Sequence, residues 1–114
     1  MVTIYHNPRC SKSRATMNIL EEKGIAPEII EYLETPPDAA TLDIFLGKLG
    51  MEPRDLMRKG EAPYKELGLK DPAKRREELI VAMVENPTLI ERPIVVNGEK
   101  ISLGRPPENV LDIL

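Results

Sequence analysis

Short apolar runs separated by proline and glycine divide the 114-residue chain into predicted elements. Residues 2–5 are mostly β-branched or aromatic and stop before Pro8, which predicts a strand, and residues 28–32 predict a second one. Between these strands we expect a helix from Cys10 to about residue 23, because Gly24 follows at the position where a glycine commonly ends a helix.

Helical patterns fill the middle of the chain. Pro36-Pro37-Asp38 predicts the start of a helix, with Thr35 as its candidate cap. Residues 51–74 are broken by prolines and glycines into short turns. Residues 73–85 predict a further helix, because apolar residues recur there four positions apart. The apolar stripe of the earlier helix consists of Leu42, Phe45, Leu46 and Leu49.

The end of the chain predicts a hairpin and a closing helix. Residues 93–96 and 99–102 flank Asn97-Gly98, a pair favoured in two-residue turns because both positions tolerate positive φ. A last helix is expected from about Pro106. The strand–helix–strand start implies a parallel pair with a right-handed crossover, and the hairpin adds antiparallel strands. We therefore predict an α/β, thioredoxin-like fold: a mixed four-stranded sheet flanked by helices, with a helical insert in the middle.

Length and charge narrow the class of protein. The length fits one domain, residues 1–114. The net charge of −3 argues against sequence-independent nucleic-acid binding, which needs a positive surface, although a few arginines can still form a local anion site. The longest apolar run, residues 79–84, is too short to span a membrane, and no segment looks like a signal peptide. We expect a cytoplasmic protein that binds neither nucleic acid nor membranes.

The single cysteine carries the candidate chemistry. One cysteine and one histidine exclude an internal disulfide and fall short of a zinc site, so no metal is expected. Cys10 follows a predicted strand directly and precedes a helix. Free backbone N–H groups and the helix dipole at that position lower a thiol pKa from about 8.5 and can also receive an oxyanion. The alternative is a buried structural cysteine.

Neighbouring side chains could assist this cysteine. Ser13 can offer its hydroxyl to the sulfur, and Lys12 and Arg14 add positive charge. His6 could orient the loop or support the thiolate. Spacing alone favours the simpler alternative, a histidine at a strand end bonded to the backbone.

Three arginines lie in segments broken by turns: Arg58, Arg92 and Arg105. Arg92 and Arg105 each precede a proline, which holds them extended. The planar guanidinium suits tetrahedral oxyanions because it donates two parallel hydrogen bonds. For each arginine taken singly, a surface salt bridge is the competing explanation.

Four segments together carry a family resemblance. They are residues 4–14, which include Cys10-Ser11-Lys12-Ser13; Leu56-Met57-Arg58-Lys59 with residues 63–69; Glu91-Arg92-Pro93 with residues 94–96; and Gly104-Arg105-Pro106. In this order and at these separations the chain resembles the glutaredoxin-coupled arsenate reductases over essentially its whole length.

The resemblance implies a role for each matching residue. Cys10 would be the nucleophile that attacks arsenate, in a protein of thioredoxin-like fold. The arginines that would surround the oxyanion and the thiol adduct are Arg58, Arg92 and Arg105. The supporting residues would be His6 for the thiolate, Ser13 and Arg14 in the loop that cradles oxygens, and Pro93 as a cis-proline facing the cysteine.

A lone thiol also constrains the reductant. Arsenic must be reduced by thiols and the chain has only one, so a resolving thiol must come from outside. We expect no bound cofactor, glutathione as co-substrate, and glutaredoxin as the partner that reduces the resulting mixed disulfide.

Other functions share these features. Regulators that bind RNA polymerase and sense redox state have a similar fold and opening motif, although they often carry a second cysteine where this chain has Ser13. A general thiol–disulfide or glutathione-handling protein is a second alternative, since fold does not fix function. A noncatalytic binding module is a third.

Overall fold

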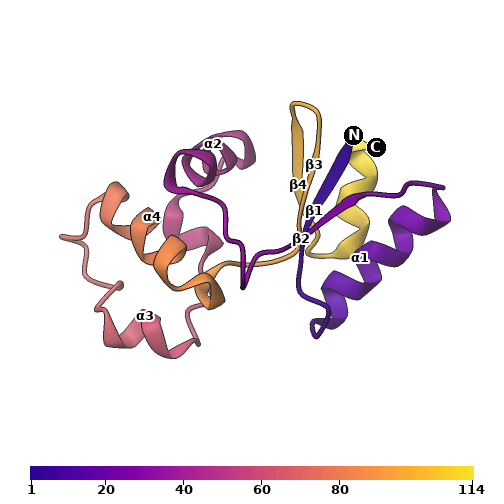
Figure 1. Cartoon of the computed structure of the whole chain (residues 1–114). Helices are drawn as coiled ribbons and strands as arrows, with labels where there is room; N and C mark the ends of the chain where they lie inside the picture. Colours follow the sequence, from indigo (N-terminus) through magenta and orange to yellow (C-terminus); the bar gives the residue numbers. More distant parts are fainter. The chain divides into compact units, whose positions relative to one another are not determined.

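The computed structural model describes all 114 residues, which form two compact units. Met1–Thr35 and Arg92–Leu114 form the first, which we call the sheet unit, and Pro36–Glu91 form the second, the helical unit (Figure 1). The helical unit is the predicted insert in the middle of the chain. Each unit is described by itself below.

The sheet unit contains one mixed sheet of four strands in the order β2-β1-β3-β4. Strand β1 (Val2–His6) pairs in parallel with β2 (Glu28–Glu31) and antiparallel with β3 (Ile94–Asn97), which in turn pairs antiparallel with β4 (Lys100–Leu103). The predicted α/β, thioredoxin-like architecture with a mixed four-stranded sheet is therefore confirmed.

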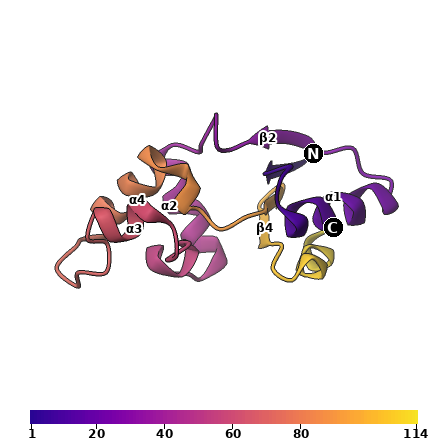
Figure 2. The same cartoon turned by 90° about the horizontal axis from the view of Figure 1, so that it is seen from below.

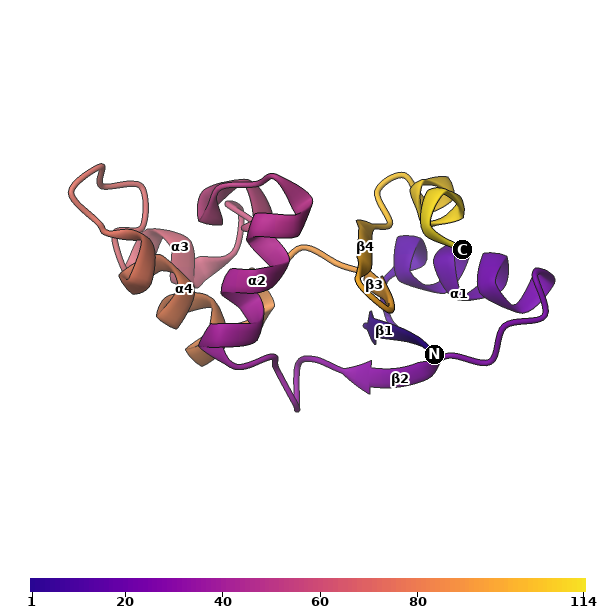
Figure 3. The ribbon, with the colours of Figure 1, turned by 90° about the horizontal axis from the view of Figure 1, so that it is seen from above.

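One face of the sheet is covered by α1 (Ser11–Glu22) and the 3₁₀ helix η3 (Pro107–Ile113), which contact each other (Figures 1 and 3). The predicted last helix is thus present, but in the tighter 3₁₀ form. Gly24 has φ of 72° just after α1, as the sequence predicts for a helix end. The core of this unit consists of Val2, Ile4, Leu20, Val95, Val110 and Ile113.

The hairpin turn differs from the prediction by one residue. Asn97 pairs with Lys100, so the two-residue loop is Gly98-Glu99 rather than Asn97-Gly98. Only Gly98 has a positive φ, 61°. This is the requirement of a type II′ turn, in which only the first central residue needs the left-handed region.

The helical unit contains α2 (Ala39–Leu49), α3 (Ala62–Glu66) and α4 (Arg76–Glu85), with 3₁₀ turns at Pro53–Leu56 and Pro87–Leu89 (Figure 2). Its buried side chains come from α2, α4, the 3₁₀ turns and the connecting segments, and none comes from α3. They include Leu42, Phe45 and Leu46 of the predicted stripe, with Leu56, Met57, Leu69, Leu79, Met83, Leu89 and Ile90. Leu49, the fourth residue of the stripe, is half-buried.

Two predicted helix starts are wrong in detail. Asp38, not Thr35, caps α2: its Oδ1 accepts a hydrogen bond from the backbone N–H of Thr41 at 2.8 Å. Helix α4 begins at Arg76 rather than near residue 73, because Asp71 binds the N–H of Ala73 in a turn of its own. No helix in the chain has the length and apolar character that crossing a membrane would require.

Candidate functional site

Cys10 is the N-cap residue of α1, with extended φ and ψ of −93° and 125°. Its backbone N–H donates to the carbonyl of Asn7 at 3.0 Å, and its own carbonyl accepts from the N–H of Arg14 at 3.0 Å. The loop and the first helical turn thus fix the cysteine backbone from both sides. Its side chain is half-buried, so the thiol remains accessible.

The surroundings of this sulfur favour the thiolate. Burial raises the pKa of the Cys10 thiol, but this effect is outweighed by the backbone N–H of Ser13, the positive charge of Arg92 and the backbone N–H of Lys12. The Arg92 side chain also donates a hydrogen bond to the sulfur, and the net pKa is lower than that of an ordinary cysteine. A thiolate at a helix start can act as a nucleophile. The backbone N–H groups stabilise its negative charge, while a lone pair on the sulfur stays free to form a bond.

Ser13 acts on the sulfur through its backbone rather than through the predicted hydroxyl contact. Its fully buried Oγ lies 2.6 Å from Nδ1 of His6 and accepts the backbone N–H of Asn7 at 3.0 Å. These two interactions connect the helix start to the end of β1. The Ser13 hydroxyl therefore holds the loop in shape, while its N–H faces the thiolate.

The surroundings of His6 lower its pKa and so favour the neutral imidazole. Burial lowers the pKa of the imidazole, and Arg14 lowers it further, while the carboxylate of Glu31 acts in the opposite direction. A neutral ring has one donor and one acceptor nitrogen, which matches a single hydrogen bond with the Ser13 hydroxyl. His6 is thus joined to the start of α1 through Ser13, and its supporting role for the thiolate stays a prediction.

The Arg14 side chain fixes the loop backbone at Pro8. Its Nη1 donates to the carbonyl of Pro8 at 3.0 Å, so the bond joins residues six apart on either side of Cys10. The side chain is exposed, so it adds positive charge near the loop while fixing the loop backbone.

Arg92, Pro93 and Arg105 lie together beside β3 and β4. The Arg92–Pro93 peptide bond is cis, as the resemblance implies, and the Arg105–Pro106 bond is cis as well. Arg105 Nη1 donates to the carbonyl of Arg92 at 3.3 Å. Since Arg92 also reaches the Cys10 sulfur, the sheet unit brings Cys10 and two of the three predicted arginines into one site.

Gly104 is a site residue that the sequence analysis did not single out. Its N–H donates to the carbonyl of Pro93 at 2.9 Å. A Cβ at this position would lie 2.6 Å from Oγ1 of Thr16 and 2.8 Å from Cγ of Pro93. Only glycine allows α1 and the cis-proline to approach so closely, and the signal in the sequence was its place in Gly104-Arg105-Pro106.

Arg58, the third predicted arginine, belongs to the helical unit. Its N–H donates to the carbonyl of Leu89 at 2.7 Å, and the N–H of Glu91 donates to Leu56 at 2.8 Å. Its guanidinium lies 3.7 Å from Glu91 and 3.5 Å from Glu61. Arg58 is thus fixed to the segment that leads into Arg92, and its role at the thiolate stays a prediction.

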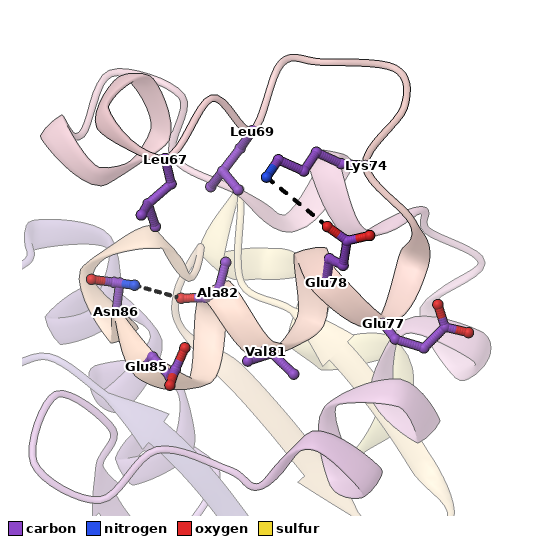
Figure 4. A pocket seen from close by; sticks show the side chains of 9 residues that line it. All are labelled: Leu67, Leu69, Lys74, Glu77, Glu78, Val81, Ala82, Glu85 and Asn86. Carbon is purple, nitrogen blue, oxygen red and sulfur yellow. Dashed lines mark hydrogen bonds and ion pairs between the residues drawn. The ribbon is translucent and has the colours of Figure 1, made fainter.

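The helical unit also has a groove of about 410 Å³, lined by Leu67, Leu69, Lys74, Glu77, Glu78, Val81, Ala82, Glu85 and Asn86 (Figure 4). Lys74 lies 4.0 Å from Glu78, and the Asn86 amide donates to the Ala82 carbonyl at 3.0 Å. None of the lining residues is a cysteine, histidine or arginine, and all of them belong to the helical unit. No cluster of histidine, cysteine and carboxylate side chains in the structure could hold a metal ion.

Comparison with known proteins gives a consistent result. The chain is 60% identical to the uncharacterized protein YfgD of Escherichia coli (strain K12), over 99% of this chain and 96% of that one. It is 47% identical to an arsenate reductase of Neisseria meningitidis serogroup A, over 99% and 97% of the two chains. A solved structure of an arsenate reductase from Vibrio cholerae superimposes with a TM-score of 0.95 at 53% identity, covering 99% of this chain and 97% of that one. A sequence model of the ArsC family matches residues 5–113, and the chain belongs to that family.

Proposed function

We propose that this protein is an oxidoreductase that reduces arsenate to arsenite, with Cys10 as its nucleophile. The observation that carries the proposal is the position of Cys10 at the start of α1, with Arg92 at its sulfur and Arg105 beside Arg92. Relatives named arsenate reductases match nearly the whole chain. Arsenate is a tetrahedral anion, so its approach to a thiolate requires positive groups of this kind.

In the first step, the Cys10 thiolate attacks arsenic. A sulfur–arsenic bond forms, and one arsenate oxygen takes up protons and leaves as water. Arsenic is still pentavalent in this adduct. Arg92 and Arg105 offset the charge of two anions that come together, and the N–H groups of Lys12 and Ser13 hold the sulfur in place.

In the second step, an external thiol supplies the reducing electrons. The thiolate of glutathione attacks the Cys10 sulfur, the sulfur–arsenic bond breaks, and its electron pair stays on arsenic, which leaves as trivalent arsenite. Cys10 is then joined to glutathione in a mixed disulfide. Glutaredoxin attacks the glutathione sulfur and returns Cys10 to the thiolate. The lone cysteine of the chain supports this order, since the protein has no second thiol to resolve the adduct. This chemistry fits a reducing, cytoplasmic compartment.

The experiment is arsenate reduction coupled to NADPH oxidation, with glutathione, glutaredoxin and glutathione reductase. We expect turnover by the natural protein and none by Cys10→Ser. Arg92→Gln and Arg105→Gln should raise the KM for arsenate and lower kcat/KM by about 10-fold or more, the loss expected for a charge-assisted hydrogen bond. Arg58→Gln tests the predicted third arginine in the same assay.

The matched control is Arg75→Gln, which removes the same charge from a side chain that is 78% exposed and pairs with Glu78. Its kinetics should equal those of the natural protein. Arsenate turnover by Cys10→Ser would refute the proposed nucleophile. Normal turnover in all three site-arginine variants would refute the oxyanion site.

Two alternatives predict different results in the same mixture. A general thiol–disulfide protein would reduce a small disulfide much faster than arsenate. A regulator would bind RNA polymerase and turn over neither substrate. Ser13 stands where such regulators often carry their second cysteine, so the chain lacks the second thiol that a dithiol switch needs.

A further inference from the structure

A second cavity, which belongs to the sheet unit, lies beside the loop that carries Cys10. Its volume is about 260 Å³, and its lining includes His6, Pro8, Arg9, Glu31, Leu33 and Glu34. We call it the β2-side cavity. His6 and Glu31 are register partners at the carboxyl ends of the parallel strands β1 and β2. This is the edge of a parallel sheet at which α/β proteins commonly bind ligands.

The cavity carries charges of both signs. Arg9 is cationic, and Glu31 and Glu34 are anionic. All three side chains are exposed, and none forms an ion pair within the protein. Their backbones are nevertheless fixed: the Arg9 N–H donates to Oδ1 of Asn7 at 3.0 Å, and the Glu34 N–H donates to the Glu31 carbonyl at 3.0 Å. The three charged side chains therefore extend from ordered backbone, where a ligand can reach them.

This charge pattern selects against arsenate and in favour of a zwitterion. Two carboxylates repel an oxyanion, so arsenate is expected on the arginine side of Cys10, near Arg92. An α-amino acid group has one ammonium and one carboxylate on the same carbon. The ammonium suits Glu31 and Glu34, and the carboxylate suits Arg9 as a two-pronged ion pair.

We propose that the β2-side cavity binds the γ-glutamyl end of glutathione, and this inference rests on the proposed function, which needs an external thiol. Glutathione has a single ammonium group, and it lies on that γ-glutamyl residue. A tripeptide spans roughly 10 Å when extended. Arg9 is the residue next to Cys10, so a γ-glutamyl group held at Arg9 can place the thiol of the next residue at the Cys10 sulfur.

The test compares glutathione with a thiol that has no amino acid end. The variants are Glu34→Gln, Glu31→Gln/Glu34→Gln and Arg9→Gln. We expect each to raise the KM for glutathione in arsenate reduction about 2- to 5-fold, the upper part of the range for an exposed ion pair. The KM for arsenate should not change, nor should the rate with 2-mercaptoethanol as reductant. Glu28→Gln removes one carboxylate from the same strand outside the cavity and is the matched control.

A second measurement does not depend on arsenate. Cys10 thiolate and glutathione disulfide exchange to give the mixed disulfide and one free glutathione thiolate, and mass spectrometry follows the product. The cavity variants should slow this exchange but not the exchange with hydroxyethyl disulfide. An unchanged ratio of the two rates in every variant would overturn the inference. If arsenate turnover is absent in the natural protein while this ratio falls in the variants, the cavity assignment stands and the proposed function fails.

Discussion

Gly104→Ala tests whether close contact between α1 and the cis-proline shapes the site. The added Cβ would lie 2.6 Å from Oγ1 of Thr16 and 2.8 Å from Cγ of Pro93, whereas ordinary contact begins at 3.4 Å. The shortfalls are about 0.8 Å and 0.6 Å. Neither neighbour can move easily, because Thr16 is fully buried and donates to the Lys12 carbonyl at 2.9 Å, and Pro93 is a buried ring.

Overpacking of this kind costs about 1–3 kcal/mol. We therefore expect the free energy of unfolding of Gly104→Ala, measured in urea by circular dichroism, to fall by that amount. The pKa of Cys10, measured from thiolate absorbance near 240 nm, should rise because displacement of Pro93 carries Arg92 away from the sulfur. Thr16→Ala in the same chain removes one of the two contacts. The double variant should therefore lose less stability than the two single variants added together.

Gly47→Ala is the matched control. Gly47 lies inside α2, and a Cβ there would meet nothing within 4 Å. Alanine is favoured over glycine in a helix by about 0.5–1 kcal/mol, so this variant should be more stable than the natural protein. The two glycine variants thus have opposite expected signs. A Gly104→Ala protein as stable as the natural one, with an unchanged thiol pKa, would refute the packing argument.

Three further predictions follow from single interactions. Arg92→Gln removes a charge and a hydrogen bond from the thiolate, so the pKa of Cys10 should rise toward its ordinary value in an absorbance titration. Burial lowers the pKa of His6 in the folded protein, so the unfolded chain binds a proton there first as the pH falls below about 6.5. Stability to urea should therefore decline between pH 7 and 5. The decline should be less steep in His6→Gln. Asp38→Ala should lower the melting temperature and Thr35→Ala should not, because only Asp38 caps α2.

The order of elements could be predicted because each depends on a local pattern. Apolar alternation marks the strands, and Gly24 and the prolines mark where helices end and begin. The parallel β1–β2 pair could be predicted because a helix between two strands is the usual crossover connection of a parallel pair. These features are properties of short segments, and the structure retains them.

The errors arose where neighbouring residues compete for one local role. Thr35 and Asp38 both precede α2, and both residue types can cap a helix. Asp38 is the cap because it lies three positions before Thr41, whose backbone N–H donates to its carboxylate. Asn97-Gly98 and Gly98-Glu99 are both acceptable turns, and the register of β3 with β4 decides between them. That register depends on which side chains face the core, a property of the whole sheet.

The same distinction between local and long-range contacts applies to the residues of the site. Cys10 at a helix start was visible in the sequence, because a thiolate needs only the N–H groups of the next residues. The sequence allows the Ser13 hydroxyl to contact the sulfur, yet in the structure it bonds to His6 and the Asn7 N–H. That contact links residues seven apart across a strand end and a loop, so it exists only once the sheet has formed. Gly104 depends on still more distant contacts, with α1 and Pro93. Local chemistry thus points to Cys10 as the candidate nucleophile, while long-range packing determines how its surroundings are held.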